Sequence, residues 1–295
     1  MNSFTISQLS QYSGIKTHTI RMWEHRYNAL KPERSEGNTR YYDNEQLRRL
    51  LNIVSMMETR HKVSELCLMS DDKLSGLVLN TKRVIKPETS EYYVSQLISA
   101  GMNYNGEYFE ELFEKCLIQY GVPEAYKVII YPLLVRVGLM WAGKAIPSAQ
   151  EHFISNLIRQ KILRSIDSLS RNIVSSDTWL LYLPENEYHE IGLLFADYII
   201  RQSGRKVVYL GNSVTQGSLY SAIEDTRPSH ILVFMIHYDL PERIQEYLVN
   251  LKKRFSGKRI CIAGNYKLLN QLSYPPELTW LKSIEDLEKM VGKNL

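Results

Sequence analysis

The sequence has few cysteines and no long apolar run. Its three cysteines are odd in number and far apart, at Cys67, Cys116 and Cys261, which excludes a disulfide framework and a cysteine zinc site. No stretch of about 18 uninterrupted apolar residues occurs, so no membrane span is expected. The start, MNSFTISQLSQYSG, lacks a basic segment followed by an apolar one, so no secretory signal is expected. We therefore expect a soluble, cytoplasmic protein without a membrane partner.

Positive charge is concentrated near the beginning of the chain. Residues 1–62 hold ten Lys and Arg against six Asp and Glu, an excess that equals the net charge of +4 for the whole protein. A basic segment of this size is what binding to phosphates requires, although a solvated basic surface gives the same count. The full length of 295 residues predicts two or three domains.

The spacing of apolar residues divides the chain into three parts. Residues 1–80 are predicted to form short helices and one hairpin, and the polar stretch 81–91 is the predicted linker. Residues 92–175 have the pattern of a four-helix bundle. Residues 176–295 alternate five short apolar runs with helical segments, which predicts a doubly wound parallel sheet of the flavodoxin-like kind. The fold class is therefore α plus α/β.

The first part has the order of a winged helix-turn-helix. Thr5 to Gln8 form a capping box for a helix that ends at Gly14, and a second helix is predicted from Lys16 to Tyr27. A hairpin follows, and Asp43 caps the next helix. The start of a recognition helix reads base edges, and the hairpin is suited to phosphate or minor-groove contacts. The predicted DNA-binding residues are Lys16, Thr17, His18, Arg21, Arg26, Arg34, Asn38, Arg40 and Tyr42.

This segment resembles the MerR family of transcription regulators. The resemblance is carried by TIRMWEHRY, by the Lys31-Pro32 pair, by Arg34 and by the wing sequence GNTRYYD, and it covers about a quarter of the chain. The Trp23 to Tyr27 variant is more similar to the light- or cobalamin-linked branch than to the metal-sensing branch. The resemblance implies double-stranded operator DNA as a partner. A helical protein-binding module is the alternative.

Two further motifs lie in the second half. Trp141 is separated by nine residues from Glu151-His152, and antiparallel packing of the two predicted helices would bring these residues to one end of the bundle. The second motif, Glu187 to Gly192, follows the first predicted strand. There His189 can present an imidazole nitrogen to a metal while a neighbouring carboxylate holds its tautomer. Gly192 would let a bulky ligand approach the helix. Taken separately, a core tryptophan and an ordinary loop histidine explain the same residues.

Together the motifs resemble the cobalamin-binding module of methionine synthase, corrinoid proteins and cobalamin-dependent MerR-type regulators, over residues 92–290. The resemblance implies cobalamin as cofactor, adenosylcobalamin rather than methylcobalamin, with His189 as the lower ligand of cobalt and with Trp141, Glu151 and His152 over the upper face. It is closest in kind to the light-dependent repressors of carotenoid genes, which implies a photoreceptor. The implied cofactor-binding residues are Trp141, Glu151, His152, Glu187, His189, Gly192, Gly211, Met235 and Gly264.

The sequence departs from that family at three places. The family's Ser or Thr near the end of the third strand is replaced by the stretch 234–237, Phe-Met-Ile-His, and its Gly-Gly pair by Ala263-Gly264, so larger side chains could narrow the tunnel for the nucleotide tail. The histidine that follows the tryptophan in the light-sensing repressors is replaced by Ala142. A second histidine ligand would then have to come from His152 or His237.

Three functional hypotheses follow. The first is a regulator that couples cobalamin to operator binding through a homo-oligomer, a dimer or tetramer, since several heads on one DNA multiply the affinity. RNA polymerase or another regulator is a possible further partner. The second is a ligand-independent regulator whose degenerate cobalamin domain serves oligomerisation or partner binding. The third, a corrinoid enzyme subunit, is disfavoured because no catalytic constellation is apparent, and we expect the chain not to be an enzyme.

Overall fold

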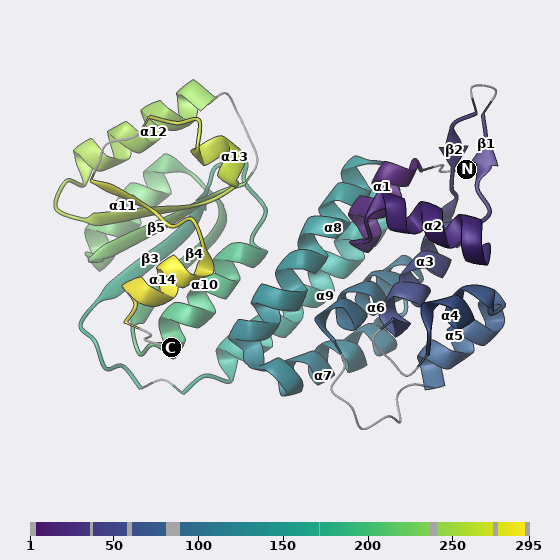
Figure 1. The fold of residues 1–295 in the computed structure, drawn as a ribbon. Coiled ribbons are helices and arrows are strands. Elements are labelled where there is room, and N and C mark those ends of the chain that lie inside the picture. Colours follow the sequence, from purple (N-terminus) through teal and green to yellow (C-terminus); the bar gives the residue numbers. More distant parts are fainter. Residues whose placement is uncertain are drawn as a thin grey trace. The chain divides into compact units, whose positions relative to one another are not determined.

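The computed structural model describes residues 4–35, 38–57, 61–80, 89–170, 172–236, 241–273 and 277–292. These residues group into two compact units, Met1–Ile158 and Arg159–Leu295. The first unit contains the predicted DNA-binding part and most of the helical bundle, and the second contains the sheet. Each unit is described by itself (Figure 1).

The first part of the chain is a winged helix-turn-helix, as predicted. Thr5 caps the first helix with a complete capping box, and Gly14 ends it in the left-handed conformation at φ 74°. Asp43 caps the helix that follows the hairpin by accepting from the Gln46 backbone N–H. The elements are α1 (Ile6–Ser13), α2 (Thr17–Tyr27), β1 (Glu33–Arg34), β2 (Arg40–Tyr41), α3 (Asn44–Met56), α4 (Val63–Leu68) and α5 (Asp71–Asn80).

The four predicted bundle helices are present in the middle of the chain. They are α6 (Ser90–Met102), α7 (Gly106–Ala125), α8 (Tyr131–Ala142) and α9 (Ser148–Asp167), with the π-helical turn η2 (Tyr126–Ile130) before α8. Gly121 has a non-helical backbone at φ 72° and interrupts α7, two residues before Pro123. The predicted linker 81–91 is too long, because Thr89 caps α6 and Ser90 begins it. Residues 81–88 lie outside the described residues.

The stretch Gly106–Ala142 is long and apolar enough to cross a membrane by length and composition. Core helices of globular proteins pass the same test, and 39% of its most apolar window is buried within the protein. The described residues contain one such stretch.

The five predicted strands form one parallel sheet in the second unit. They are β3 (Thr178–Pro184), β4 (Lys206–Val214), β5 (His230–Met235), β6 (Arg259–Gly264) and β7 (Leu278–Trp280). Their order is β4-β3-β5-β6-β7. The strand after β3 in the chain, β4, therefore lies on one side of β3, and the next strand, β5, lies on the other side. This is the flavodoxin-like order, in which the crevice for a ligand opens between the ends of β3 and β5.

Helices cover both faces of this sheet (Figure 1). One face packs on α11 (Gln216–Thr226), α12 (Pro241–Arg254) and α13 (Tyr266–Leu269) through alternate strand residues such as Tyr182, Val233 and Ile262. The other face is covered by α10 (Ile191–Gln202) and α14 (Ile284–Met290). Because side chains alternate along a strand, each residue of β5 belongs to one face only.

Candidate functional site

The second helix of the helix-turn-helix presents polar side chains at its start. Lys16, His18 and Arg21 are exposed there, Thr17 is half-buried, and Arg26 is exposed in the last turn. The apolar residues Ile20 and Trp23 of α2 are buried and anchor the helix. The predicted reading residues are therefore at least partly exposed, as contact with a DNA groove requires.

The hairpin that forms the wing carries two more exposed DNA-binding candidates. Arg34 donates a hydrogen bond to the side chain of Asn38, and Asn38 adopts a left-handed backbone at φ 59°, which asparagine tolerates better than most residues. Arg40 is half-buried, and its Nε lies 3.4 Å from Glu24 on α2. The wing is thus tied to the second helix through Arg40.

Tyr42 requires a correction. It is predicted as a DNA contact, but its side chain is 1% exposed and its hydroxyl donates to Glu24. Burial and the Glu24 carboxylate both raise the pKa of this hydroxyl, so it stays a neutral donor. Its backbone also pairs with Phe4. Tyr42 therefore orients the wing from inside instead of facing DNA.

Trp141 lies at the end of α8, beside the start of α9. Its indole is 49% exposed, and Nε1 donates to Ser148 Oγ at 3.1 Å. Glu151 lies one turn further along α9, where it accepts from Ser155 Oγ at 2.6 Å and faces His152 Nδ1 at 3.1 Å. The imidazole of His152 is 71% exposed. The helix turn thus brings Trp141, Glu151 and His152 to one end of the bundle, as the spacing predicts.

Glu187 and His189 form a tight pair just after β3. Glu187 Oε1 lies 2.6 Å from His189 Nδ1 and also accepts the backbone N–H groups of Tyr188 at 2.9 Å and His189 at 3.0 Å. The other oxygen, Oε2, accepts the N–H of Ile236 after β5 at 2.9 Å. The glutamate is buried with 6% of its side chain exposed, whereas the imidazole is 58% exposed.

This pair therefore occupies the topological switch point of the sheet. A single carboxylate joins the loop after β3 to the end of β5, and those are the two ends between which ligands bind in this strand order. With Nδ1 directed to the carboxylate, Nε2 is the ring nitrogen suited to ligate a metal, and such a carboxylate fixes the ring orientation and raises its basicity.

A second buried carboxylate stands beside this pair and is absent from the predicted site residues. Glu190 Oε2 lies 2.9 Å from Arg159 Nε, and Glu190 Oε1 accepts from the Tyr209 hydroxyl at 2.9 Å. Burial and Glu190 raise the pKa of Tyr209, so that hydroxyl remains a donor. Gly211 follows Tyr209 at φ 82°, and a Cβ added there would lie 3.6 Å from Glu190 Oε1. Arg159 and Glu190 are 31 positions apart, so no local sequence pattern predicts that they pair.

Met235 also requires a correction. It is predicted to line the ligand site, but its side chain is 4% exposed and packs in the core against α11, α12 and α13. The preceding residue, Phe234, points to the other face, where its ring lies 2.9 Å from the place of a Cβ on Gly192. The alternation of strand side chains thus places Phe234, not Met235, beside the predicted ligand loop.

The two predicted glycines near this strand end differ in what surrounds them. The space beside Gly192 is filled by the Phe234 ring, so a ligand can approach there only if that ring moves. Gly264 has φ 136°, and a Cβ added to it would meet the Met235 carbonyl oxygen at 2.0 Å. Gly264 is therefore required by the backbone itself, at the end of β6.

Comparisons with known proteins bear on these sites. Residues 4–67 match the family described as MerR HTH family regulatory protein, and residues 93–164 match the family described as B12 binding domain. The chain carries a MerR-type helix-turn-helix domain and a B12-binding domain. The first of these domains is therefore of the MerR DNA-binding type.

Two relatives from Myxococcus xanthus match most of this chain at low identity. The chain is 24% identical to the HTH-type transcriptional repressor CarH over 258 residues, which covers 85% of each protein. It is 25% identical to the HTH-type transcriptional repressor CarA over 260 residues, 88% of this chain and 85% of CarA. Both relatives are transcriptional repressors.

The fold of the helical middle and the sheet has a counterpart among solved structures. The monomethylamine corrinoid protein of Methanosarcina barkeri matches with a TM-score of 0.53 at 14% identity, covering 68% of this chain and 98% of that protein. This likeness confirms the fold class, a helical middle followed by a Rossmann-like parallel sheet.

Proposed function

We propose that this regulator binds adenosylcobalamin through His189 and uses it to control operator binding. The Glu187–His189 pair at the switch point carries this proposal. A half-exposed imidazole oriented by a buried carboxylate is the donor that a corrin cobalt would take from below, so the residues present fit the group. When bound, the corrin supplies a cobalt–carbon bond that light can break.

The protein's own residues have separate tasks in this proposal. Glu187 holds the His189 ring and its tautomer, and the exposed Trp141 would contact an adenosyl group. Glu151 and His152 stand beside it on α9. The resulting complex is a dimer or tetramer in the cytoplasm, which presents several MerR-type heads to one operator. Multiple heads raise affinity without new contacts in any single head.

The residue after Trp141 bears on the response to light. Ala142 is exposed at the end of α8 and offers no ligand to cobalt, so a bis-histidine product cannot use that position. His152 is exposed and could ligate cobalt instead, whereas His237 lies outside the described residues.

An absorption spectrum tests the proposal. The purified protein is incubated with adenosylcobalamin in the dark and desalted, and its visible bands are recorded before and after green light, with His189→Ala beside it. Retained corrin bands that differ in His189→Ala support a cobalamin sensor, and a light-induced change adds photoreception. If the desalted protein is colourless, cobalamin is not its ligand.

A second candidate is a regulator that works without cobalamin, and the position of Phe234 favours it. The ring occupies the space beside Gly192, next to the predicted axial loop. A protein in which that ring stays in place would keep its fold and serve oligomerisation or partner binding through the second half. It would bind its operator equally well with and without adenosylcobalamin.

A further inference from the structure

Helix α8, which carries Trp141, also packs against the winged helix-turn-helix, residues 4–57, which we call the head. Helix α1 packs against α8 within the first unit. At Gly143, which caps α8, a Cβ would lie 2.3 Å from the hydroxyl of Tyr12 and 3.3 Å from Nε2 of Gln8, both on α1. Tyr12 is 1% exposed. Only glycine permits this close approach, and it lies two residues after Trp141.

A second contact lies seven residues before Gly143, within α8. Arg136 makes a two-pronged ion pair with Glu91 of α6, with Nη1 to Oε1 at 2.6 Å and Nη2 to Oε2 at 2.8 Å. The arginine side chain is 14% exposed. A Cβ on Gly14 would lie 2.6 Å from Arg136 Nη2. Gly14 is the turn between α1 and the recognition helix, so the guanidinium directly supports that turn.

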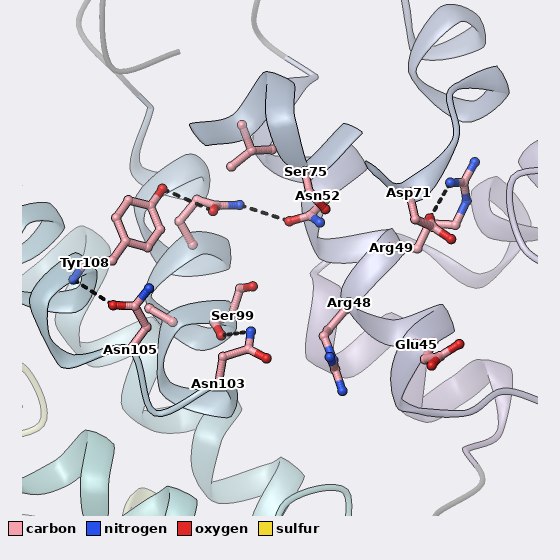
Figure 2. Close-up of a pocket in the computed structure, with 13 residues that line it drawn as sticks. Glu45, Arg48, Arg49, Asn52, Asp71, Ser75, Ser99, Asn103, Asn105 and Tyr108 are labelled. Atoms are coloured by element: carbon pink, nitrogen blue, oxygen red, sulfur yellow. Dashed lines mark hydrogen bonds and ion pairs between the residues drawn. The ribbon is translucent and has the colours of Figure 1, made fainter. Parts of the chain in front are cut away.

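A third contact joins the head to the bundle through polar groups. Gln96 of α6 is 2% exposed and donates from Nε2 to Ser55 Oγ of α3 at 2.9 Å, while its Oε1 accepts from the Tyr108 hydroxyl at 3.3 Å. Gln96 Nε2 also donates to Asn52 Oδ1 at 3.4 Å, and Figure 2 shows Asn52 beside a cavity of about 430 Å³. The cavity is lined from both sides of the junction, by α3 and α5 and by α6 and α7.

These contacts have unequal mechanical consequences. The Gln96 hydrogen bond and the cavity both involve α3, the helix that follows the wing. Arg136 and Gly143 instead lie on α8 and meet α1 and the turn that begins the recognition helix. A shift of α8 therefore reaches the recognition helix through two packed contacts, without passing through the wing.

We propose that Arg136, held by Glu91, is the residue that positions the recognition helix, and that α8 transmits the state of the site at Trp141 to it. This inference rests on the proposed function for the ligand at Trp141. The bidentate pair suits this task because two parallel N–H···O bonds fix direction as well as distance. In an oligomer the direction of each head sets the spacing of half-sites it can read.

The test compares Arg136→Gln with Arg136→Lys and with a matched control, Lys115→Gln. Lys115 pairs with Glu111 at 3.2 Å within α7, so its variant removes a bundle ion pair that does not involve the head turn. Operator Kd is measured in the dark with and without adenosylcobalamin, and the ratio of the two is the coupling. Corrin retention is read from the visible bands, and hydrogen exchange of residues 9–20 is measured without ligand.

The expected result separates coupling from stability. Couplings between sites are typically about 5- to 150-fold. We expect wild type and Lys115→Gln to have the same ratio of the two operator Kd values. Arg136→Gln should retain corrin but have a ratio below about 2. Arg136→Lys should recover part of the wild-type ratio. A ratio unchanged in Arg136→Gln, with both Kd values weakened equally, would mean that Arg136 is only structural and would overturn the inference.

Hydrogen exchange distinguishes this inference from the proposed function. If the wild type retains no corrin, the proposed function fails and transmission of a corrin state fails with it. The positioning role is then judged from the ligand-free protein, where Arg136→Gln should exchange faster than Lys115→Gln at residues 9–20. Equal exchange would remove that role too. If Arg136→Gln does not fold, Glu91→Gln replaces it and gives the same comparison.

Discussion

Replacing Glu187 by glutamine should weaken cobalamin binding while the fold survives. The carboxylate receives three backbone N–H groups and faces His189 Nδ1. Glutamine keeps one acceptor oxygen and turns the other into an NH₂ donor. Whichever way the amide is oriented, its NH₂ group then faces a backbone N–H, either that of Ile236 or those of Tyr188 and His189.

The magnitude follows from these contacts. A buried N–H left without an acceptor costs about 1–3 kcal/mol of unfolding free energy. Loss of the partner that orients a metal-ligating histidine typically costs about 10- to 100-fold in metal affinity. Since each tenfold change corresponds to about 1.4 kcal/mol, we expect a loss of about 1.4–2.8 kcal/mol in binding of adenosylcobalamin.

The assay is an equilibrium titration with adenosylcobalamin followed by its visible bands, together with denaturant unfolding of the ligand-free protein. Glu185→Gln is the matched control, because Glu185 is exposed and lies two residues before Glu187 in the same loop. It should bind as the wild type does. If Glu187→Gln binds within twofold of Glu185→Gln, the carboxylate does not orient an axial ligand and the assignment of His189 is wrong.

Four further outcomes are expected. Arg21→Ala should weaken operator binding by about 1–3 kcal/mol in an electrophoretic shift assay and leave corrin bands unchanged; unchanged binding would remove it from the recognition surface. Trp141→Ala should retain corrin but lose preference for the adenosyl form over the methyl form in competition, and an equal preference would exclude its capping role. Gly264→Ala should lower the unfolding free energy by about 2–4 kcal/mol, because the residue has φ 136° and its Cβ would meet a carbonyl oxygen; an unchanged denaturation midpoint would contradict this. Burial lowers the pKa of His230 below its ordinary value of 6.5, so the neutral ring contributes stability that is present above pH 6.5 and is lost as the pH falls toward the lower folded pKa; this loss should disappear from the unfolding free energies of His230→Gln.

The sequence predicts the elements well because their signals are local. The capping box at Thr5, the left-handed Gly14 and the five apolar strand runs all depend on neighbours within a few residues. Once those elements are known, the parallel sheet follows from their alternation. The loop after the first strand, with His189, is correctly placed at the carboxyl ends of the strands for the same reason.

The residues that sequence reasoning places wrongly depend on distant partners. Tyr42 is buried because Glu24, eighteen residues earlier, accepts its hydroxyl proton in a hydrogen bond. Met235 lies on the core face and not beside the predicted ligand loop, because the face of β5 is set by its neighbours in the sheet, and an apolar run of strand length does not indicate which face is which. Arg136 carries no motif at all, since its partner lies forty-five residues away.

Four carboxylates make long-range links that the local signals miss. Glu24, Glu91, Glu187 and Glu190 each bind at least one group from a distant segment of the chain. Their basic partners range from 14% exposed beside Glu91 to 58% exposed beside Glu187, so water weakens most of these attractions and the pairs contribute little net stability. What they fix is direction: of the wing, of the helix-turn-helix, of the imidazole and of the loop around it. A protein that couples a ligand to DNA depends on such directions, and neutral glutamine substitutions should therefore change coupling and binding more than they change melting.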